Sequence, residues 1–454
     1  MGKYFGTDGI RGRANIELDP MLAFHTGQAA AHVLSSKNGH KTKILIGKDT
    51  RISSDMLEAA LVAGICSMGV DVELLGVITT PAVAFMTVKH KADAGIVISA
   101  SHNPFEHNGI KIFGSMGYKL NDDLEEQIEG LISNPEPLRM KTHHEIGRVI
   151  RNEGAAADEY VSFLAGTIDG DLSGLKIAVD CANGASCKTA AKLFSKVNAD
   201  CEIKFDEPDG ININSDCGST HLNSLRQRVV SGGFDVGVAF DGDADRCLMV
   251  CENGEILDGD RIMAACALEM KREGRLKGDT FVATVMSNLG LHAFAKSAGM
   301  HVVCADVGDR FVLEEMLKGG FILGGEQSGH VIFLNHITTG DGQLTALQFL
   351  SLLKKSGKKA SEFFNMIEQY PQVLTNVKVP NDMKKAIASE EKVAEVIREE
   401  ENAFGEDGRI LVRPSGTESL VRIMVEGKDE ARVKNAAKKI ADVINRVTEE
   451  KKKM

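Results

Sequence analysis

The sequence has none of the features that mark a membrane or secreted protein. No uninterrupted apolar run approaches the roughly 20 residues that a transmembrane helix needs. The most apolar stretch, residues 70–88, is interrupted by Asp71, Glu73 and Pro81. The first residues, MGKYFGTDG, contain no apolar signal core. We therefore expect no membrane segment and a cytoplasmic location.

Basic residues are also few. Lys and Arg total 53 against 64 Asp and Glu, which gives a formal net charge of −11. That sign disfavours non-specific binding to nucleic acid or to an anionic membrane, so neither is expected as a partner. An anionic small molecule is still allowed, because a local cationic pocket can oppose the overall charge.

Cysteine pairs at metal-binding or redox spacing are missing as well. The nine cysteines are odd in number and scattered, and no CxxC pair occurs. This pattern is typical of reduced thiols and argues against both a disulfide framework and a zinc site. The hydrophobic fraction of 43% and the charged fraction of 26% describe an ordinary globular protein, and 454 residues are enough for several domains.

One order of predicted elements occurs three times. Short apolar segments typical of buried strands alternate with segments of helical periodicity, including a helix predicted for residues 185–196. This βαβαβ order predicts strands that run parallel and are covered by helices. The predicted strands are residues 44–48, 70–76 and 94–98 in the first repeat, 175–180, 201–205 and 234–240 in the second, and 280–285, 301–305 and 321–325 in the third.

The last part of the chain has a different pattern. A strand-like segment at 375–380 precedes a charged helix predicted for 384–402, a strand–loop–strand segment at 410–427 and an amphipathic helix at 429–450. These elements predict a smaller α+β domain. Linkers expected near 134–155, 252–260 and 368–374 divide the chain into four predicted domains, residues 1–150, 151–255, 256–370 and 371–454.

In each repeat the last predicted strand leads into a polar loop. These loops are SASHNP (99–104), DGDADR (241–246) and GEQSGH (325–330). Ligands of open α/β sheets bind outside the carboxyl ends of the strands. The three loops are therefore expected to meet at one cleft, although each taken alone is also compatible with an ordinary polar turn.

The DGDADR loop is the sharpest of these signals. Asp241, Asp243 and Asp245 alternate, so an extended backbone aims their carboxylates to one side. Oxygen donors of this kind suit Mg²⁺ or Ca²⁺. A helix–loop–helix calcium site would need Gly where Arg246 stands and helices where strands are predicted, which favours Mg²⁺ completed by a substrate phosphate. An Asp-rich turn without metal is the other interpretation.

Two further loops contain groups suited to phosphate. In SASHNP, Ser101 is a candidate acceptor hydroxyl, and no GxSxG motif supports a hydrolase. In RPSGTES (413–419), Arg413 can donate two hydrogen bonds to one phosphate, while Gly416 lets backbone N–H groups approach it. The latter segment lacks the P-loop pattern, and a plain hairpin turn remains an alternative for it.

Taken together, these motifs resemble the α-D-phosphohexomutase superfamily along essentially the whole chain. FGTDGIRG (5–12), SASHNP, DGDADR, GEQSGH and RPSGTES stand in the order and spacing of that family. VGDR at 307–310, Gln327 and HITTGDG at 336–342 are most similar to its branch that acts on glucosamine phosphates. Asp306 before VGDR and Phe311 after it depart mildly from the family pattern.

The resemblance implies an α/β fold of three successive βαβαβ-type domains with mixed sheets, plus a smaller C-terminal α+β domain, around a central cleft. It implies interconversion of glucosamine 6-phosphate and glucosamine 1-phosphate through a phosphoserine and a sugar bisphosphate that serves as primer and intermediate. The product would feed the synthesis of UDP-N-acetylglucosamine and the cell wall. Sugar phosphates would be the small-molecule partners, and a homodimer is expected.

The resemblance also implies roles for individual residues. Ser101 would carry the phosphoryl group and, together with Asp241, Asp243 and Asp245, bind one Mg²⁺. Three cations would lie beside the transferring phosphoryl group: Arg11, Lys111 and Arg246. Of these, Lys111 is a candidate proton shuttle. The sugar would contact Glu326, Ser328 and Arg310, and the distal phosphate would contact Arg413, Ser415, Gly416 and Thr417.

Three other functions stay open at this point. A phosphoglucomutase or phosphomannomutase shares the same motifs. A Mg²⁺-dependent phosphatase would release phosphate without a bisphosphate primer. A calcium-binding or scaffold protein would show no turnover and no phosphoserine.

Overall fold

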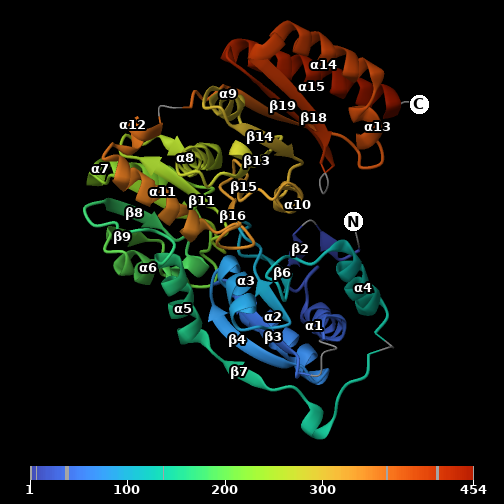
Figure 1. Ribbon diagram of the computed structural model, residues 1–454. Helices are drawn as coiled ribbons and strands as arrows, with labels where there is room; N and C mark the ends of the chain where they lie inside the picture. Colours follow the sequence, from blue (N-terminus) through green and yellow to red (C-terminus); the bar gives the residue numbers. More distant parts are fainter. Residues whose placement is uncertain are drawn as a thin grey trace. The chain divides into compact units, whose positions relative to one another are not determined.

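The computed structural model describes residues 3–6, 8–35, 40–135, 138–364, 367–415 and 419–452 (Figure 1). The chain divides into two compact units, one of residues 1–286 and 300–365 and the other of residues 287–299 and 366–454. The first unit contains three sheets and the second contains one. None of the described helices is long and apolar enough to cross a membrane.

The first sheet has seven strands in the order β1-β2-β6-β5-β3-β4-β7. Strands β3, β4, β5 and β7 are parallel, whereas β1, β2 and β6 pair antiparallel at one side of the sheet. The elements are β1 (Phe5–Gly6), β2 (Gly9–Arg13), α1 (Pro20–Leu34), β3 (Lys43–Lys48), α2 (Ser54–Ser67), β4 (Asp71–Val77), α3 (Thr80–Lys89), β5 (Ala94–Ile98), β6 (His107–Gly114), α4 (Asp122–Ser133), a 3₁₀ turn (His143–Glu145) and β7 (Val149–Arg151).

Strand β3 shows how this sheet is buried on both faces. Successive side chains of a strand point to opposite faces. Ile44 and Ile46 join the cluster formed with α1, α2 and α4, and Leu45 between them is also fully buried. Helix α3 lies against β3 and β5, with α5 (Glu153–Ala165) beside it (Figure 1). Burial on both faces explains why these strands are continuous apolar runs in the sequence.

The second and third sheets repeat this plan. Their strand orders are β12-β11-β10-β8-β9 and β14-β13-β15-β16. The strands of the second sheet and the helices between them are β8 (Lys176–Asp180), a 3₁₀ turn (Ala185–Lys188), α6 (Ala190–Lys196), β9 (Asp200–Lys204), α7 (Asn223–Gly232), β10 (Val236–Phe240), β11 (Cys247–Cys251) and β12 (Ile256–Leu257). The strands of the third sheet and the helices around them are α8 (Gly259–Arg272), a 3₁₀ turn (Lys277–Asp279), β13 (Thr280–Thr284), β14 (His301–Ala305), α10 (Asp309–Gly319), β15 (Leu323–Gly325), β16 (Val331–Phe333), α11 (Gly342–Ser356) and α12 (Ala360–Phe364).

Each of the three polar loops connects an antiparallel pair of strands. The register pairs Ile98 with Ile110 in β5–β6, Phe240 with Cys247 in β10–β11, and Gly325 with Val331 in β15–β16. Parallel strands precede each loop, and an antiparallel strand follows it. The sheets are therefore mixed, as the predicted fold class states.

Two predicted helices are interrupted in the structure. The helix predicted for residues 185–196 is a 3₁₀ turn followed by α6, with Thr189 at the junction. The φ of Thr189, −119°, is far from the value of about −63° in a regular α-helix, and its hydroxyl donates to Gln343 Oε1 of α11 at 2.8 Å. The helix predicted for 384–402 is α13 (Lys384–Ala388) and α14 (Glu391–Phe404), because Glu390 has an extended backbone.

The second unit is the smaller α+β structure that the sequence predicts. Its sheet has the order β17-β19-β18 and is antiparallel throughout. The apolar stripe of its last helix, which includes Val433, Ile440 and Ile444, packs into the core against Ile423 and Val425. The remaining elements are α9 (Leu289–Ser297), β17 (Gln372–Lys378), a 3₁₀ turn (Gly405–Asp407), β18 (Gly408–Pro414), β19 (Leu420–Gly427) and α15 (Glu430–Lys452). The exact limits of the four domains stay a prediction.

Candidate active site

Ser101 lies in the loop between β5 and β6 with an unusual backbone conformation. Its φ is +53°, in the left-handed region that a non-glycine residue enters only at a cost. Its side chain is buried, and its backbone N–H donates to Ser99 Oγ at 2.9 Å. The Ser99 hydroxyl in turn donates to Asp49 Oδ2 at 2.6 Å. The loop is thus held by hydrogen bonds that do not use the Ser101 hydroxyl.

Arg51 holds the same loop through its backbone oxygens. Its guanidinium is fully buried and pairs with Asp49, with 2.8 Å between Nε and Oδ2. It donates to the backbone oxygens of four loop residues, which are Ser101, Asn103, Pro104 and His107. The planar guanidinium, with five N–H donors, suits this role.

The Ser101 hydroxyl points to the aspartate loop that follows β10. Its Oγ donates to Asp241 Oδ2 at 2.6 Å. Carboxylate oxygens of Asp241, Asp243 and Asp245 all lie within 4.8 Å of one another, and all three residues are buried. The structure therefore brings the first two sequence loops together at one point.

Asp243 also connects this cluster to the first sheet. Its Oδ2 accepts from Thr80 Oγ1 at 2.6 Å and from Lys111 Nζ at 2.8 Å. Thr80 begins α3 and Lys111 lies in β6, so both partners come from elements beside the serine loop.

The donor set fits a divalent metal ion. The buried Oδ1 atoms of Asp243 and Asp245 accept no hydrogen bond within the described part of the chain. Three close carboxylates repel each other unless a cation joins them, and donors that are all oxygen suit a hard cation. The cluster therefore contains two unsatisfied acceptors where a metal ion would supply the missing charge.

The charges around the cluster are unevenly balanced. Burial, together with Asp245 and Asp243, raises the pKa of Asp241 well above its usual value. Burial acts against ionisation of Asp245 too, but Lys111, His330 and Arg246 lower its pKa. The carboxyl group that most needs a cation is thus the one beside the Ser101 hydroxyl.

The three predicted cations lie around this centre. Lys111 is buried, and although burial opposes its charge, Asp243, Asp8 and Asp245 raise its pKa. Arg11 pairs with Asp8, and the Arg246 backbone N–H donates to Asp241 Oδ1 at 3.2 Å. The buried Nε atoms of Arg11 and Arg246 have no hydrogen-bond partner within the described residues. Two unused N–H donors at one site suit an anion such as a phosphoryl group.

His102, next to Ser101, is kept neutral. Burial, followed by the Arg246 and Arg11 guanidinium groups, lowers the pKa of His102 to about 4. Its Nδ1 lies 3.4 Å from Ser101 Oγ. At neutral pH this imidazole therefore adds no charge to the site.

The third loop reaches the cluster through His330. Its Nδ1 lies 3.6 Å from Asp245 Oδ2, and its Nε2 accepts from the Gly340 backbone N–H at 3.1 Å. Burial, opposed by His330 and Arg246, raises the pKa of Glu326. Ser328 is exposed at the tip of the turn. The loop thus brings His330 and the Glu326 carboxyl group within electrostatic reach of the aspartate cluster.

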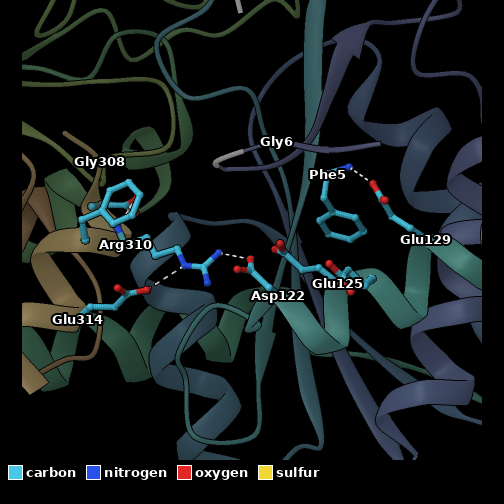
Figure 2. Close-up of a pocket in the computed structure, with 11 residues that line it drawn as sticks. Phe5, Gly6, Asp122, Glu125, Glu129, Gly308, Arg310 and Glu314 are labelled. Atoms are coloured by element: carbon cyan, nitrogen blue, oxygen red, sulfur yellow. Dashed lines mark hydrogen bonds and ion pairs between the residues drawn. The ribbon is translucent and has the colours of Figure 1, made fainter. Parts of the chain in front are cut away.

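Arg310 lines a cavity of about 450 Å³ whose lining includes none of the three aspartates. Figure 2 shows its guanidinium between two carboxylates, Asp122 of α4 and Glu314 of α10. The Nε–Oε1 distance to Glu314 is 3.2 Å, and Nη1 donates to Asp122 Oδ1. The predicted sugar contact is thus engaged elsewhere in this structure.

The predicted distal-phosphate residues belong to the second unit. Arg413 is in β18 and Ser415 follows that strand. Gly416 and Thr417 lie outside the described residues. The contact of this segment with phosphate stays a prediction.

Several residues of the site were missed by sequence reasoning. They include the loop supports Asp49 and Arg51, and a set of charged residues around Lys111: Asp8, Lys119, Asp309 and His330. Asp8, Asp309 and His330 belong to the motifs FGTDGIRG, VGDR and GEQSGH, so their place in a motif could have marked them as site residues. Lys119 carries no such signal, because its two partners are distant in the sequence.

Comparison with known protein families decides the classification. The chain matches models of four consecutive phosphoglucomutase/phosphomannomutase domains. These are α/β/α domain I at residues 2–139, α/β/α domain II at 158–254, α/β/α domain III at 258–370 and the C-terminal domain at 374–443. The chain belongs to the phosphoglucomutase/phosphomannomutase family. The predicted fold class and superfamily are thereby confirmed.

Members of this family include close relatives of the chain. A phosphoglucosamine mutase from Acetivibrio thermocellus is 55% identical over 445 residues, covering 98% of this chain and 99% of the relative. One from Ruminiclostridium cellulolyticum is 54% identical with the same coverage.

Solved structures of the family share the fold. A phosphoglucomutase/phosphomannomutase family protein from Burkholderia thailandensis has a TM-score of 0.82 at 22% identity, covering 97% of both chains. An N-acetylphosphoglucosamine mutase from Aspergillus fumigatus, solved with GlcNAc-6P and magnesium, has a TM-score of 0.65 at 18% identity, covering 94% of this chain and 99% of that chain.

Proposed function

We propose that this protein interconverts glucosamine 6-phosphate and glucosamine 1-phosphate through a phosphorylated Ser101 and a glucosamine bisphosphate. Support comes from family membership and from relatives of more than 50% identity that are named phosphoglucosamine mutase. The observation that carries the proposal is the position of the Ser101 hydroxyl, 2.6 Å from Asp241 in a buried aspartate cluster. An acceptor hydroxyl beside a divalent-cation site is what phosphoryl transfer requires.

Mg²⁺ is the cation we propose for the cluster. Asp241, Asp243, Asp245 and the phosphate on Ser101 would hold it. Bound there, it would neutralise charge on the phosphoryl oxygens. The two buried carboxylate oxygens without partners support this assignment.

The proposed reaction consists of two phosphoryl transfers. The O1 hydroxyl of glucosamine 6-phosphate forms a bond to phosphorus as the bond from phosphorus to Ser101 Oγ breaks, and the hydroxyl proton passes to the enzyme. The bisphosphate then turns end for end. Its 6-phosphoryl group returns to Ser101, and the O6 atom takes back a proton. Each turnover leaves the phosphoserine as it began.

This chain's cations would act on the phosphoryl oxygens. The free Nε–H groups of Arg11 and Arg246 would donate to them, and the charged Lys111 would lie beside the same oxygens. Donors fixed before the reaction stabilise the charge of the transition state at no reorganisation cost. Lys111 is also the proposed proton shuttle. Because it is already charged, it would give a proton to the departing oxygen, Ser101 Oγ in the first transfer and O6 in the second, and take one back from the attacking hydroxyl.

The remaining contacts complete the proposal. Glu326, Ser328 and Arg310 would hold the sugar, and the segment from Arg413 to Thr417 would hold the phosphate that is not transferring. For Arg310 this requires release from Asp122 and Glu314. We also propose a cytoplasmic location and a homodimer. Free thiols at all nine cysteines support the former, and light scattering tests the latter.

The test is a coupled assay with glucosamine 6-phosphate, glucose 6-phosphate and mannose 6-phosphate, each with and without a sugar bisphosphate primer. We expect the highest kcat/KM with glucosamine 6-phosphate and stimulation by the primer. Preference for glucose or mannose phosphate would instead identify a phosphoglucomutase or phosphomannomutase. Steady phosphate release without primer would identify a phosphatase, and no turnover of any sugar would reject an enzyme of this class.

A further inference from the structure

Lys119 joins two carboxylates that are distant in the sequence. Its Nζ donates to Asp309 Oδ2 at 2.5 Å and also to Asp8 Oδ1. Asp8 lies in the turn between β1 and β2, Lys119 follows β6, and Asp309 is the first residue of α10. A single ammonium group therefore ties the first sheet to the start of the helix that follows the VGDR loop.

The same contacts continue to the aspartate cluster. Asp8 Oδ2 lies 3.2 Å from Lys111 Nζ, and Lys111 Nζ lies 2.8 Å from Asp243 Oδ2. Negative and positive groups thus alternate without a break from Asp243 to Asp309. The end of this chain of ion pairs lies one residue from Arg310.

These ion pairs are unlike those on the protein surface. The side chains of Asp8, Lys119 and Asp309 are 22%, 19% and 18% exposed. Exposed pairs contribute little, because water screens them and long side chains lose entropy on pairing. When a largely buried charge loses its partner, the remaining charge lacks compensation and its surroundings must rearrange. The position of Asp309 therefore depends strongly on Lys119.

We propose that Lys119 is a positioning residue, which sets the VGDR loop and Arg310 relative to the Ser101 centre and so determines sugar affinity and sugar preference. This inference rests on the proposed function and assigns a role to a residue outside the sequence motifs. Lys119 acts through Asp309 and does not touch the aspartate cluster.

The geometry explains why sugar binding is the property affected. Arg310 and Glu314 belong to α10, whose first residue Lys119 holds, whereas Asp122, the other partner of Arg310, belongs to α4 (Figure 2). Loosening the start of α10 shifts Arg310. Ser101 and Asp243 keep contacts that do not involve α10, with Arg51, Thr80 and Lys111. The capacity of Ser101 to carry phosphate should therefore persist.

Two substitutions remove the link in different ways. Asp309→Asn weakens the bond on the loop side. Lys119 stays paired with Asp8, and His330, which also faces Asp309, stays beside Asp245, so no cation is stranded. Lys119→Met removes the ammonium but keeps most of the side-chain length. Lys119→Arg retains the charge, and Lys192→Met is the control, because it breaks an exposed pair with Asp158 far from this network in the sequence.

For each folded variant we would measure kcat and KM with glucosamine 6-phosphate and glucose 6-phosphate, and the phosphoserine content by intact-protein mass spectrometry. We expect Asp309→Asn and Lys119→Met to raise KM for glucosamine 6-phosphate by about tenfold while kcat changes by less than about threefold. The ratio of kcat/KM for glucosamine 6-phosphate to that for glucose 6-phosphate should fall in both variants. In Lys119→Arg this ratio should stay close to that of the wild type. Phosphoserine content and the kinetics of Lys192→Met should match the wild type.

An unchanged KM and sugar preference in folded Asp309→Asn would overturn the proposal, whether or not Lys119→Met folds. Equal losses of kcat with both sugars and an unchanged KM would also overturn it, since they would indicate a general structural role. Failure of the proposed function is seen separately, because the wild type would then not prefer glucosamine 6-phosphate before any residue is changed.

Discussion

Arg51 and Ser101 are joined through the main chain, with Arg51 Nη2 donating a 2.9 Å hydrogen bond to the Ser101 carbonyl oxygen. The same guanidinium holds three further carbonyls of the loop and is neutralised by Asp49. The serine is thus fixed by its backbone, and its hydroxyl stays available. This arrangement suits a side chain that gains and loses a phosphoryl group without disturbing its loop.

Arg51→Met should destabilise the protein strongly. It leaves the buried Asp49 without its cationic partner and takes one donor from each of four loop carbonyls, a change that typically costs about 3–5 kcal/mol. Urea unfolding of the wild type and the variant measures the difference in free energy of unfolding. Arg13→Met, which breaks the exposed pair with Glu17, is the control and should cost much less. Equal losses in the two variants would contradict the role of Arg51.

Ser101→Ala should abolish the phosphoprotein and nearly all turnover. Removal of the acceptor oxygen should lower kcat by at least about 10³-fold. Intact-protein mass spectrometry should show a phosphate adduct on the wild type and none on the variant. Ser115→Ala, at an exposed position, should retain both. A near wild-type rate with the adduct on another residue would refute the assignment.

Asp243→Asn should raise the Mg²⁺ concentration that the enzyme needs for activity. The change keeps the shape of the side chain but removes one negative charge from a site suited to a hard cation. Activity should fall and recover in part as Mg²⁺ is raised, which a titration of both proteins measures. Asp55→Asn, whose carboxylate is 86% exposed beside Lys48, is the matched control. If Asp243→Asn and the wild type respond alike to Mg²⁺, the cluster is an acidic turn without metal.

Arg413→Ala should weaken the binding of both monophosphates. If the bisphosphate turns over between the two steps, the 413–417 segment must hold the 6-phosphate in one and the 1-phosphate in the other. Losing a charged hydrogen-bond donor costs about 1.5–3 kcal/mol of binding free energy. Calorimetry in the Ser101→Ala background should show comparable losses for glucosamine 1-phosphate and glucosamine 6-phosphate. A loss confined to one ligand would mean that the segment serves only one orientation.

Glu125→Gln should change how stability depends on pH. Burial raises the pKa of Glu125 from 4.5 to about 7 in the folded protein. Between these values the folded state binds more protons than the unfolded state, so the contribution of Glu125 is fully present below pH 4.5 and is lost as pH rises through about 7.

Thermal unfolding at about pH 5 and pH 8 tests this expectation. The stability of Glu125→Gln relative to the wild type should rise from the lower to the higher pH. Glu126→Gln, at the exposed neighbouring position, is the control. A difference between Glu125→Gln and the wild type that does not change with pH would show that Glu125 titrates normally.

Much of the fold could be read from local patterns. Strands buried on both faces, such as residues 94–98, must be apolar throughout, so their limits appear directly in the sequence. The break at Thr189 could not be read, and the hydroxyl of that residue bonds to Gln343, a partner 154 residues away that local patterns do not reveal. Periodicity reports which face of a helix is buried but not which distant side chain a residue at its end will contact.

The same distinction applies to the site. The aspartate loop was predictable because its three carboxylates are close in the sequence, and a bound cation is the interpretation that best accounts for them. Lys119 was not, since an isolated lysine in a sequence looks like any surface lysine until Asp8 and Asp309 are seen on either side of it. Arg310 was assigned to the sugar, and its partners Asp122 and Glu314 became visible only in three dimensions.

The antiparallel strand pairs that enclose the three loops limit how this site can be altered. Both ends of residues 241–246 are hydrogen-bonded across the sheet, from Phe240 to Cys247. An inserted residue cannot be absorbed by slipping β11 along β10, because a one-residue slip would exchange the two faces of the strand. Loop length is therefore a fixed quantity here. New sugar specificities are best sought by exchanging side chains within these loops, and added segments are better placed in the connections between domains.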